Sequence, residues 1–440
     1  MTTTGKPAPI APERRSQTLD TVRGLAVLGI LVVNVGFVAM PFFAVSNPTI
    51  WGGHGGLDEL TFYVQVTFFD GKMRGLFSML FGAGLWLQWT KAEREGTAAG
   101  FGDVWSRRCL WLVLFGLVHG YLLQWAGDIL FAYGIAGLFL FPLRLLGSRA
   151  LIALATILLT IGFAFDAVAL VGRGEDARGY TEAIAVREHG GTLDDDQQAA
   201  IARWERNHPR KTADSPPVQE LLTAFRSGWT ASAAVSAEFT AYLQTSYFVQ
   251  HMFWDTLGLM LLGIVLARSR WLQGQGGTRS YVTAMVVGYG VAAPVVWSLA
   301  MADHDANFSA LEIGTEWARI ALYHPTRIAI GLAHAAALLL VLRSRLGETL
   351  LRPLAAVGRA ALSNYILQTL LCTTWFFGFG FGFYGELSRF QQMLFVAGVW
   401  AIAMIWSPLW LRRFRFGPLE WAWRSLVHWR RQPMRRSREP

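Results

Sequence analysis

The stretch TLDTVRGLAVLGILVVNVGF, residues 18–37, decides the fold of this 440-residue chain. It is long and apolar enough to cross a bilayer as an α-helix, which takes roughly 20 residues, yet it contains Asp20, Arg23 and Asn34. Arg23 and Asn34 are eleven residues apart, about three helical turns, and therefore share one face. Charged groups inside a membrane are costly unless they face a partner or a cavity. The stretch thus predicts a membrane helix with its polar face turned toward other helices.

The composition of the whole chain also indicates a membrane protein. Hydrophobic residues make up 53% of the sequence and aromatic residues 13%, with 19 tryptophans, which exceeds the usage of soluble domains. Cys109 and Cys372 lie inside apolar runs, which excludes a disulfide framework, and no metal site is expected. The net charge of +9 comes from arginines between the apolar runs and in the C-terminal tail, and favours contact with anionic lipid over binding of nucleic acid. We expect an all-α, polytopic membrane bundle.

The distribution of apolar runs predicts ten transmembrane helices with both termini in the cytoplasm. Basic residues, beginning with Arg14 and Arg15, fall at alternate ends of successive runs, whereas the opposite short connections contain only Arg389. By the positive-inside rule, the basic ends face the cytoplasm. The predicted spans are residues 19–41, 62–89, 108–125, 128–146, 149–171, 245–267, 280–301, 314–342, 356–383 and 391–411.

These spans divide the chain into two membrane halves joined by a long polar connection. Residues 1–171 form an N-terminal five-helix half, residues 172–240 an extracytoplasmic loop or cap, residues 241–411 a C-terminal five-helix half, and residues 412–440 a basic cytoplasmic tail. Within the cap, the segment LDDDQQAAIARWERNH predicts a capped, solvated helix.

The third span carries a candidate for acid–base chemistry. His119 lies eleven residues after Arg108, on the same helical face. The short break QWAGD then sends the chain back, with Asp128 at the outer mouth of the next span. A carboxylate can orient an imidazole as a general base, so these two residues predict a catalytic pair. The alternative is a core histidine whose hydrogen bonds are satisfied.

Further polar residues lie inside other predicted spans. Lys72 and Arg74 in the second span either extend to the interface or, at membrane depth, suit an anionic ligand. Arg327 lies near the middle of the eighth span, where a long side chain reaches water least easily. The remaining candidates for binding a cofactor or substrate are His251 and Asp255 in the sixth span, His324 in the eighth, and Arg359, Asn364 and Gln368 in the ninth.

Several segments in one order resemble a known family, the YeiB-type bacterial inner-membrane proteins. The similar segments are TLDTVRGLAVLGILVVNV, GKMRGLFSMLFGAGLWL, RRCLWLVLFGLVHGYLLQWAGDILFAYGIAG, GRAALSNYILQTLLC and RFGPLEWAWRSL, so the resemblance runs almost from end to end. The N-terminal half is similar in turn to the transmembrane acyltransferases typified by the enzyme that acetylates terminal glucosamine of heparan sulfate. In that family, a span that begins with Asp-x-x-Arg-Gly ends in an asparagine, and a histidine follows in the non-cytoplasmic loop.

On this chain the matching residues are Asp20, Arg23, Gly24 and Asn34, with His54 as the nearest loop histidine. The gap from Asn34 to His54 is longer than in that family, which leaves His119 as a rival for the catalytic base. The resemblance implies transfer of an acyl group, acetyl foremost, from cytoplasmic acyl-coenzyme A to an extracytoplasmic glycan, lipid or small molecule.

The chemistry that the resemblance implies has three parts. A histidine general base takes a proton from the acceptor as it attacks the thioester. Asn34 donates a hydrogen bond to the developing oxyanion. The phosphates of the coenzyme bind to cations, for which the candidates are Arg23, Lys72, Arg74, Arg327 and Arg359.

Two other function classes remain open on the sequence. A transporter or flippase for an anionic or lipid-linked substrate would use the same cationic cavity without covalent chemistry. Many transporters contain inverted repeats, and the two halves of this chain show no persuasive repeat, which favours the enzyme. A purely structural membrane protein would leave Arg327 and the histidines without a purpose. A homodimer is expected by analogy alone.

Overall fold

The computed structural model describes residues 17–436, and these residues form helices and their connections with one isolated bridge between Phe414 and Arg435. The predicted basic residues Arg14 and Arg15 and the end of the tail, 437–440, lie outside the described residues. The first half of the fold consists of α1 (Gln17–Ala39), α2 (Phe43–Ser46), α3 (Leu57–Val64), η2 (Gln65–Phe69), α4 (Lys72–Arg94), η3 (Ala98–Gly100), α5 (Phe101–Leu117), η4 (Val118–Leu122), α6 (Leu130–Leu143), α7 (Ser148–Glu188), α8 (Asp195–Asn207) and α9 (Pro216–Arg226).

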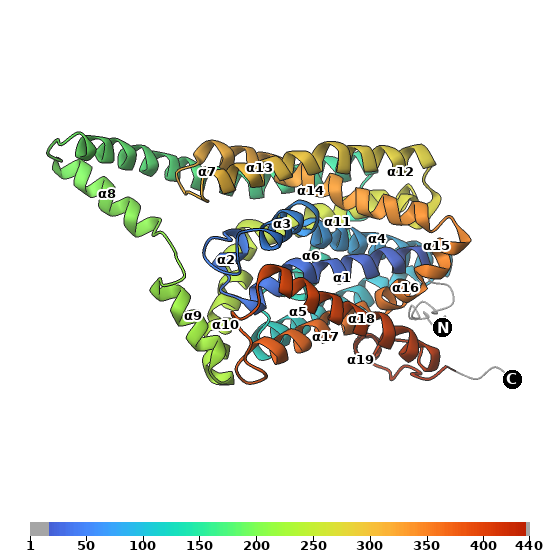
Figure 1. Ribbon diagram of the computed structural model, residues 1–440. Helices are drawn as coiled ribbons and strands as arrows, with labels where there is room; N and C mark the ends of the chain where they lie inside the picture. Colours follow the sequence, from blue (N-terminus) through green and yellow to red (C-terminus); the bar gives the residue numbers. More distant parts are fainter. Residues whose placement is uncertain (1–16, 437–440) are drawn as a thin grey trace.

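The second half begins with a helix that returns the chain to the bundle. It consists of α10 (Trp229–Gln244), η5 (Phe248–Met252), α11 (Phe253–Arg268), η6 (Trp271–Gln275), α12 (Thr278–Met285), η7 (Val286–Ala292), α13 (Ala293–Asp305), α14 (Ile313–Val341), α15 (Arg345–Leu350), α16 (Arg352–Arg359), α17 (Ala361–Phe376), α18 (Arg389–Arg413) and α19 (Pro418–Val427). Figure 1 shows most of these helices running side by side along one common direction.

Within residues 17–436, six helical segments are long and apolar enough to cross a membrane. They are α1, α7, α14, α18, Trp229–Gln275 and Thr278–Asp305, the last two each joining several consecutive elements. The predicted all-helical membrane bundle is therefore confirmed, whereas the count of ten spans is not. The other four predicted spans, 62–89, 108–125, 128–146 and 356–383, correspond to helices that are broken, short or charged at their ends.

The second predicted span shows why these segments differ from simple spans. The chain is helical from Leu57 through the π-helical turn η2, breaks at Asp70, and starts again at Lys72 after Gly71, whose φ of 70° is favourable for glycine. The Lys72 ammonium turns back and donates a hydrogen bond to the carbonyl oxygen of Val66 at 2.5 Å. Asp70, Gly71 and Lys72 therefore form a helix break within the bundle.

Two glycine contacts allow the central helices to approach closely. A methyl group on Gly82 of α4 would overlap with the carbonyl oxygen of Met260 on α11, and one on Gly263 of α11 would overlap with that of Met79. Small residues at helix crossings permit this backbone-to-backbone packing in membranes. The α4–α11 contact also brings Arg74 on α4 to Asp255 on α11.

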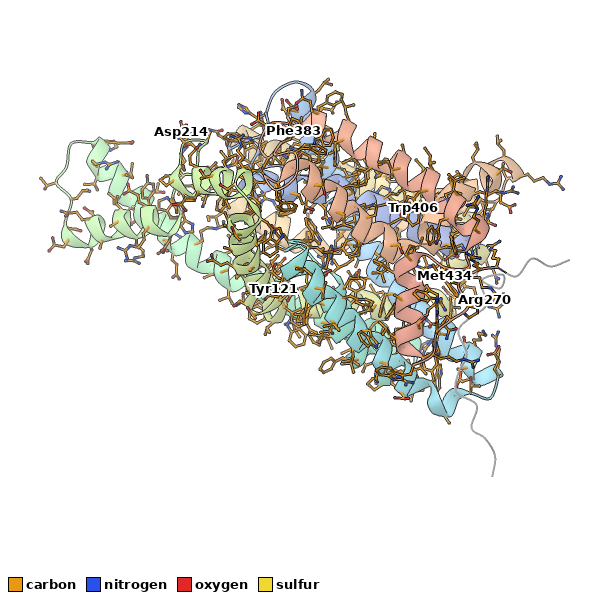
Figure 2. The ribbon with its side chains drawn as sticks, turned by 90° about the horizontal axis from the view of Figure 1, so that it is seen from below. Tyr121, Asp214, Arg270, Phe383, Trp406 and Met434 are labelled. Atoms are coloured by element: carbon orange, nitrogen blue, oxygen red, sulfur yellow. The ribbon has the colours of Figure 1, made fainter. Side chains whose placement is uncertain are left out.

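The two ends of the bundle differ. The start of α1 contacts η6 and α16, and Figure 2 shows Arg270 and Met434 at this same end. At the opposite end, α7 extends as one helix to Glu188, past the predicted span end at residue 171, and α8 projects away from the bundle (Figure 1). The next helix, α9, packs back against the bundle, where the rings of Phe225 and Tyr384 stack at 4.7 Å. The predicted capped helix is present as α8, because Asp194 and Gln197 form a reciprocal capping box.

Candidate functional site

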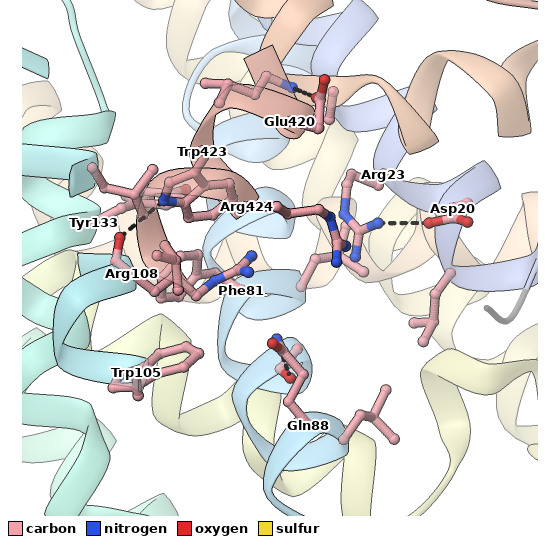
Figure 3. Close-up of a pocket in the computed structure, with 18 of the residues that line it drawn as sticks. Asp20, Arg23, Phe81, Gln88, Trp105, Arg108, Tyr133, Glu420, Trp423 and Arg424 are labelled. Carbon is pink, nitrogen blue, oxygen red and sulfur yellow. Dashed lines mark hydrogen bonds and ion pairs between the residues drawn. The ribbon is translucent and has the colours of Figure 1, made fainter. Parts of the chain in front are cut away.

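A cavity of about 580 Å³ opens at the end of the bundle where α1 begins. Its walls come from α1, α4, α5, α6, α16, α17 and α19, so residues from both halves of the chain meet there. Its volume is in the range of small-molecule and cofactor sites. Figure 3 shows Arg23, Arg108 and Arg424, from three different helices, directed into this space.

The mouth of the cavity has an excess of positive charge. Asp20 accepts a hydrogen bond from Arg23 at 2.6 Å, Glu95 lies 3.6 Å from the Lys91 ammonium, and Glu420 accepts hydrogen bonds from backbone N–H groups at the start of α17. The acidic side chains are therefore engaged by the protein itself. Among residues 17–436, the lysines and arginines that line the cavity are Arg23, Lys91, Arg94, Arg108, Arg359 and Arg424, and the acidic lining residues are Asp20, Glu95 and Glu420.

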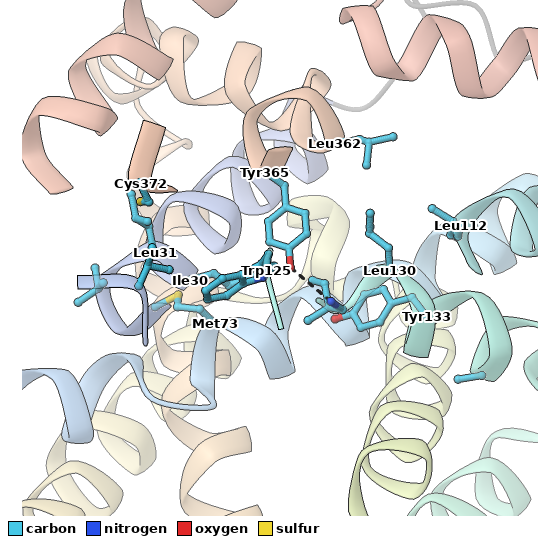
Figure 4. Close-up of a cluster of buried hydrophobic side chains, with 14 of the residues drawn as sticks. Ile30, Leu31, Met73, Leu112, Trp125, Leu130, Tyr133, Leu362, Tyr365 and Cys372 are labelled. Atoms are coloured by element: carbon cyan, nitrogen blue, oxygen red, sulfur yellow. Dashed lines mark hydrogen bonds between the residues drawn. The ribbon is translucent and has the colours of Figure 1, made fainter. Parts of the chain in front are cut away.

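The deep part of the cavity is apolar and ends on two tyrosines. Phenylalanine, leucine and isoleucine side chains line the walls, and Tyr133 and Tyr365 close the inner end. The Tyr365 hydroxyl oxygen accepts hydrogen bonds from the indole N–H of Trp125 at 2.9 Å and from the backbone N–H of Ile129 at 3.3 Å. Figure 4 shows the Tyr365 hydroxyl directed toward Trp125 within this buried cluster.

His119 lies directly behind Tyr365, with the two ring centroids 4.9 Å apart. Its Nδ1 is 2.7 Å from Asp128 Oδ1, and its Nε2 is 2.8 Å from the hydroxyl oxygen of Thr369. An ionised carboxylate can only accept, so Nδ1 carries the proton and Nε2 accepts from the threonine hydroxyl. The histidine side chain is fully buried. The structure thus places His119 and Asp128 in direct contact and adds a hydroxyl on the other ring nitrogen.

Local sequence explains how His119 and Asp128 meet. Asp128 lies just before α6, and its Oδ2 accepts the N–H of Phe131 at 2.8 Å, as a helix-capping carboxylate does. His119 lies in the π-helical turn η4 at the end of α5; such turns recur at functional sites. At Gly116 any side chain would overlap with the Asp128 carboxylate and the start of α6, so the glycine permits the close approach.

A second group of charged residues lies deeper in the bundle, around Asp255. Arg327 donates from both terminal nitrogens to the two Asp255 oxygens, and Arg74 donates to Oδ2 at 2.8 Å. His324 Nδ1 accepts from Arg327 at 2.9 Å. Arg327 is only 1% exposed and lies at the midpoint of α14. Arg74 and Arg327, two of the arginines that the sequence analysis assigned to coenzyme phosphates, are thus bound to a carboxylate outside the large cavity. We call Arg74, Asp255, His324 and Arg327 the Asp255 cluster.

A smaller cavity of about 200 Å³ adjoins the Asp255 cluster. His251, Asp255 and His324, three of the predicted substrate-binding residues, line it together with Arg74 and Tyr247. Hydrogen bonds link the linings of the two cavities: the hydroxyl of Tyr133, which lines the large cavity, is 2.7 Å from Ser78 Oγ and 3.2 Å from the backbone oxygen of Arg74, which lines the smaller one.

The other predicted site residues lie apart from both cavities. Asn34 is half-buried on α1 and His54 is exposed in the connection before α3; among the hydrogen bonds of residues 17–436 none joins them. Asn364 accepts from Trp406 at 2.9 Å and donates to Ser407 at 3.0 Å, and Gln368 donates to the backbone of Val27. The two amides therefore attach α17 to α18 and α1.

Sequence reasoning missed several residues of the site. Thr369, Tyr365 and Trp125 are unremarkable within apolar runs, and Thr369 is 250 positions from the histidine that it contacts. Arg424 was included only in a basic tail, although α19 brings it back to the cavity. One signal was available in the sequence, because Arg108 and His119 share a helical face. In the structure, Arg108 lies at the cavity mouth and His119 belongs to the buried His119–Asp128 pair.

Comparisons with known proteins find relatives over nearly the whole chain and leave its chemistry open. The Uncharacterized protein YeiB from Escherichia coli (strain K12) is 31% identical over 435 residues, which cover 94% of this chain and 96% of the relative. The Uncharacterized protein YxaH from Bacillus subtilis (strain 168) is 28% identical, and the alignment covers 97% of each chain. The family model described as protein of unknown function (DUF418) matches residues 266–430.

No solved structure matches this chain. The similarity to YeiB nevertheless covers 94% of this chain and therefore extends into both halves of the fold. The chain therefore belongs to the YeiB family of multi-pass helical membrane proteins.

Proposed function

We propose that this protein is a membrane-bound acyltransferase that takes an acyl group, foremost acetyl, from acyl-coenzyme A bound in the large cavity. The observation that carries the proposal is the order of chemical environments along the cavity. Basic residues surround the mouth, apolar walls follow, and the buried His119–Asp128 pair lies behind the inner end. Acyl-coenzyme A has the same order, with phosphates at one end, a long uncharged arm, and the thioester at the other end.

The mouth supplies the groups that phosphates require. Arginine guanidinium groups form bidentate, charge-assisted hydrogen bonds with phosphate oxygens. Six basic side chains against three acidic ones leave a surplus of three positive charges around the mouth. Arg23 and Arg359, both predicted from the sequence to bind the coenzyme, belong to this group, whereas Lys72, Arg74 and Arg327 are bound to other partners.

The distance along α5 fits a ligand that reaches inward. Arg108 at the mouth and His119 are eleven residues apart, a rise of about 16 Å along the helix. His119 has the arrangement of a general base, since Asp128 fixes its Nδ1 proton and leaves Nε2 as the acceptor. This residue, rather than the exposed His54, is therefore our candidate for the base.

The proposed orientation follows from the basic residues. The positive-inside rule assigns the cavity mouth to the cytoplasm, where acyl-coenzyme A is found, in the inner membrane of a bacterium. The broken helices α3–α4, α5–η4, α6 and α16–α17 then complete the bundle within the bilayer, giving ten spans with both termini cytoplasmic. The acceptor, a glycan, lipid or small molecule, approaches from the opposite side.

The test is binding of acetyl-coenzyme A to the detergent-purified protein, measured by calorimetry. We expect saturable binding that Arg359→Gln weakens by about tenfold or more, because a hydrogen bond to a charged group contributes about 1.5–3 kcal/mol. Arg352→Gln is the matched control, since Arg352 lies on the same helix, is exposed and does not line the cavity. Absence of binding to folded protein, or equal loss in both variants, contradicts the proposal.

One observation favours a second candidate, a transporter for an anionic or lipid-linked substrate. The linings of the two cavities meet where the Tyr133 hydroxyl contacts Ser78 and the Arg74 backbone, and a pathway closed at that contact would join them. A transporter would bind its substrate without using His119 as a base. Release of free coenzyme A thiol that depends on His119 separates the two functions.

A further inference from the structure

The hydroxyl of Thr369 is oriented unlike those of most other threonines in the helices of this protein. Thr326 and Thr373, like the buried Thr21 and Thr61, donate to the carbonyl oxygen four residues earlier. The Thr369 hydroxyl instead lies 2.8 Å from His119 Nε2, across the interface between α17 and η4. Asp128, His119 and Thr369 thus form a continuous carboxylate–imidazole–hydroxyl chain, the arrangement that activates a hydroxyl nucleophile.

We propose that Thr369 is the nucleophile of this protein and carries the acyl group as an ester between donor and acceptor; this rests on the proposed acyltransferase function. In the first step, Thr369 Oγ1 attacks the thioester carbonyl carbon while its proton passes to His119 Nε2. The carbon–sulfur bond then breaks, and the leaving thiolate takes the proton from His119 and departs as free coenzyme A. Asp128 stabilises the imidazolium that forms between these events.

The second step regenerates the threonine. A hydroxyl or amine of the acceptor attacks the ester carbonyl carbon and gives its proton to His119 Nε2. The bond between that carbon and Thr369 Oγ1 breaks, and His119 returns the proton to the threonine oxygen. The net reaction moves one acyl group from sulfur to the acceptor and consumes no other reactant.

The position of Thr369 argues against direct transfer. Its hydroxyl occupies the acceptor site of His119 Nε2, and the imidazole is fully buried. An acceptor molecule could reach this nitrogen only by displacing Thr369. A covalent relay removes the difficulty, because donor and acceptor need not be present together and each can approach from its own side of the membrane.

Tyr365 and its two hydrogen-bond donors complete the site. Leu362 and Tyr365 of α17 face the cavity, and Thr369 lies one helical turn beyond Tyr365. The Tyr365 ring therefore lies between the cavity and the nucleophile, next to His119. Trp125 Nε1 and the Ile129 N–H both donate to the Tyr365 hydroxyl oxygen. When the ring turns aside to admit the thioester, these two donors are available to the oxyanion of the tetrahedral intermediate.

The experiment uses acetyl-coenzyme A with a labelled acetyl group and no acceptor. The full-length protein in detergent is mixed with this donor, free thiol release is followed, and the protein is digested and mapped by mass spectrometry. We expect release of one thiol per protein and one acetyl group on the peptide that contains Thr369. Label that maps to another residue, or thiol release without label, overturns the relay in the unaltered protein without any variant.

Variants of two threonines on α17 sharpen the result. Thr369→Val is expected to abolish labelling, a loss of at least about a hundredfold, while it still binds acetyl-coenzyme A; Thr369→Ser is expected to become labelled. Thr373→Val is the control, because Thr373 lies one turn further along the same helix and bonds only within that helix. We expect it to be labelled like the unaltered protein.

The outcomes separate the relay from the acyltransferase itself. If Thr369→Val binds the donor and still releases thiol at the original rate, transfer is direct, with His119 as base, and the relay is wrong while the proposed function stands. If the unaltered protein binds no acetyl-coenzyme A in the calorimetric experiment, both proposals fall.

Discussion

The large cavity and the Asp255 cluster both contain arginines inside a membrane protein, yet the two regions use them differently. Around the cavity mouth, six basic residues exceed three acidic ones, and the acids are engaged by the protein. In the Asp255 cluster, one carboxylate accepts hydrogen bonds from two arginines, and an imidazole accepts another from Arg327. The first region carries more basic than acidic side chains around an open cavity, and the second region pairs its charges with one another.

This difference shows what a buried charge means in a membrane protein. By its position in an apolar span, Arg327 is the charged residue whose burial in the membrane costs the most free energy. This cost explains why Arg327 is paired with Asp255 and does not serve as a ligand site. Arg359 is less buried, lies at a helix end and lines the large cavity. A charged side chain deep in the bilayer is therefore expected to be paired within the protein. An excess of basic side chains around a cavity instead predicts that the cavity binds an anionic ligand.

The largest effect on stability is expected from a substitution that disrupts the Asp255 cluster. Asp255→Asn leaves Arg74 and Arg327 without their shared carboxylate, and removing one partner of a buried ion pair costs about 3–5 kcal/mol. We expect a strong drop in the apparent Tm of the protein in detergent, measured by thermal unfolding. Asp103→Asn is the control, because Asp103 is exposed and pairs with Arg107 within one helix, so its loss changes stability by less than about 1 kcal/mol. Equal Tm values for the two variants would contradict the structural role of the cluster.

A smaller effect is expected from separating the helices that carry the cluster. Gly82→Ala inserts a methyl group against the Met260 backbone and pushes α4 from α11, which present Arg74 and Asp255 to each other. Overpacking of this kind costs about 1–3 kcal/mol, again visible as a lower apparent Tm. Gly398→Ala on α18, where a methyl group meets open space, should unfold like the unaltered protein. A neutral Gly82→Ala would mean that the two helices can move apart freely.

A change in salt concentration should affect the cavity mouth but not the Asp255 cluster, and the expected effect is smaller than those of the two substitutions above. Raising the salt concentration from about 0.1 M to about 1 M shortens the Debye length from about 10 Å to about 3 Å. The affinity for acetyl-coenzyme A, measured by calorimetry, should fall several-fold, because the cavity mouth is open to solvent. The difference in Tm between Asp255→Asn and the unaltered protein should change little, because that cluster is buried. A salt-independent affinity would show that the phosphates do not bind at the mouth.

The sequence was sufficient for the class of fold and for one contact of the site. Strong apolar runs made the helical bundle predictable, and the short break between His119 and Asp128 was enough to predict their contact. The count of spans was not predictable in the same way. Apolar length does not reveal that Gly71 breaks one helix or that α7 continues through polar residues to Glu188.

The rest of the site depends on contacts between segments that are distant in sequence. Thr369 reaches His119 only because α17 packs against the end of α5, and Arg424 reaches the cavity only because α19 folds back under the bundle. Arg327 and Asp255 are 72 positions apart, so their pairing could not be separated from ligand binding by inspection of either helix. The type of charge and its helical spacing can be read from one segment of sequence, whereas the partner that a charged side chain binds depends on how the helices pack.

The smallest expected effect concerns His428, which follows α19, outside the six candidate spans, and lines the cavity mouth. Burial together with Arg424, Arg107 and Arg108 lowers the pKa of His428 to about 4. The unfolded chain, with a pKa near 6.5, therefore binds the proton more readily, so this histidine lowers stability as the pH falls from about 6.5 toward 4. His428→Gln should reduce the fall in Tm over this interval.

Saturating acetyl-coenzyme A should shrink the difference between variant and unaltered protein, because phosphates beside His428 favour its protonated form and raise its pKa. A difference that ligand leaves unchanged would place the phosphates away from His428, toward Arg23 and Lys91.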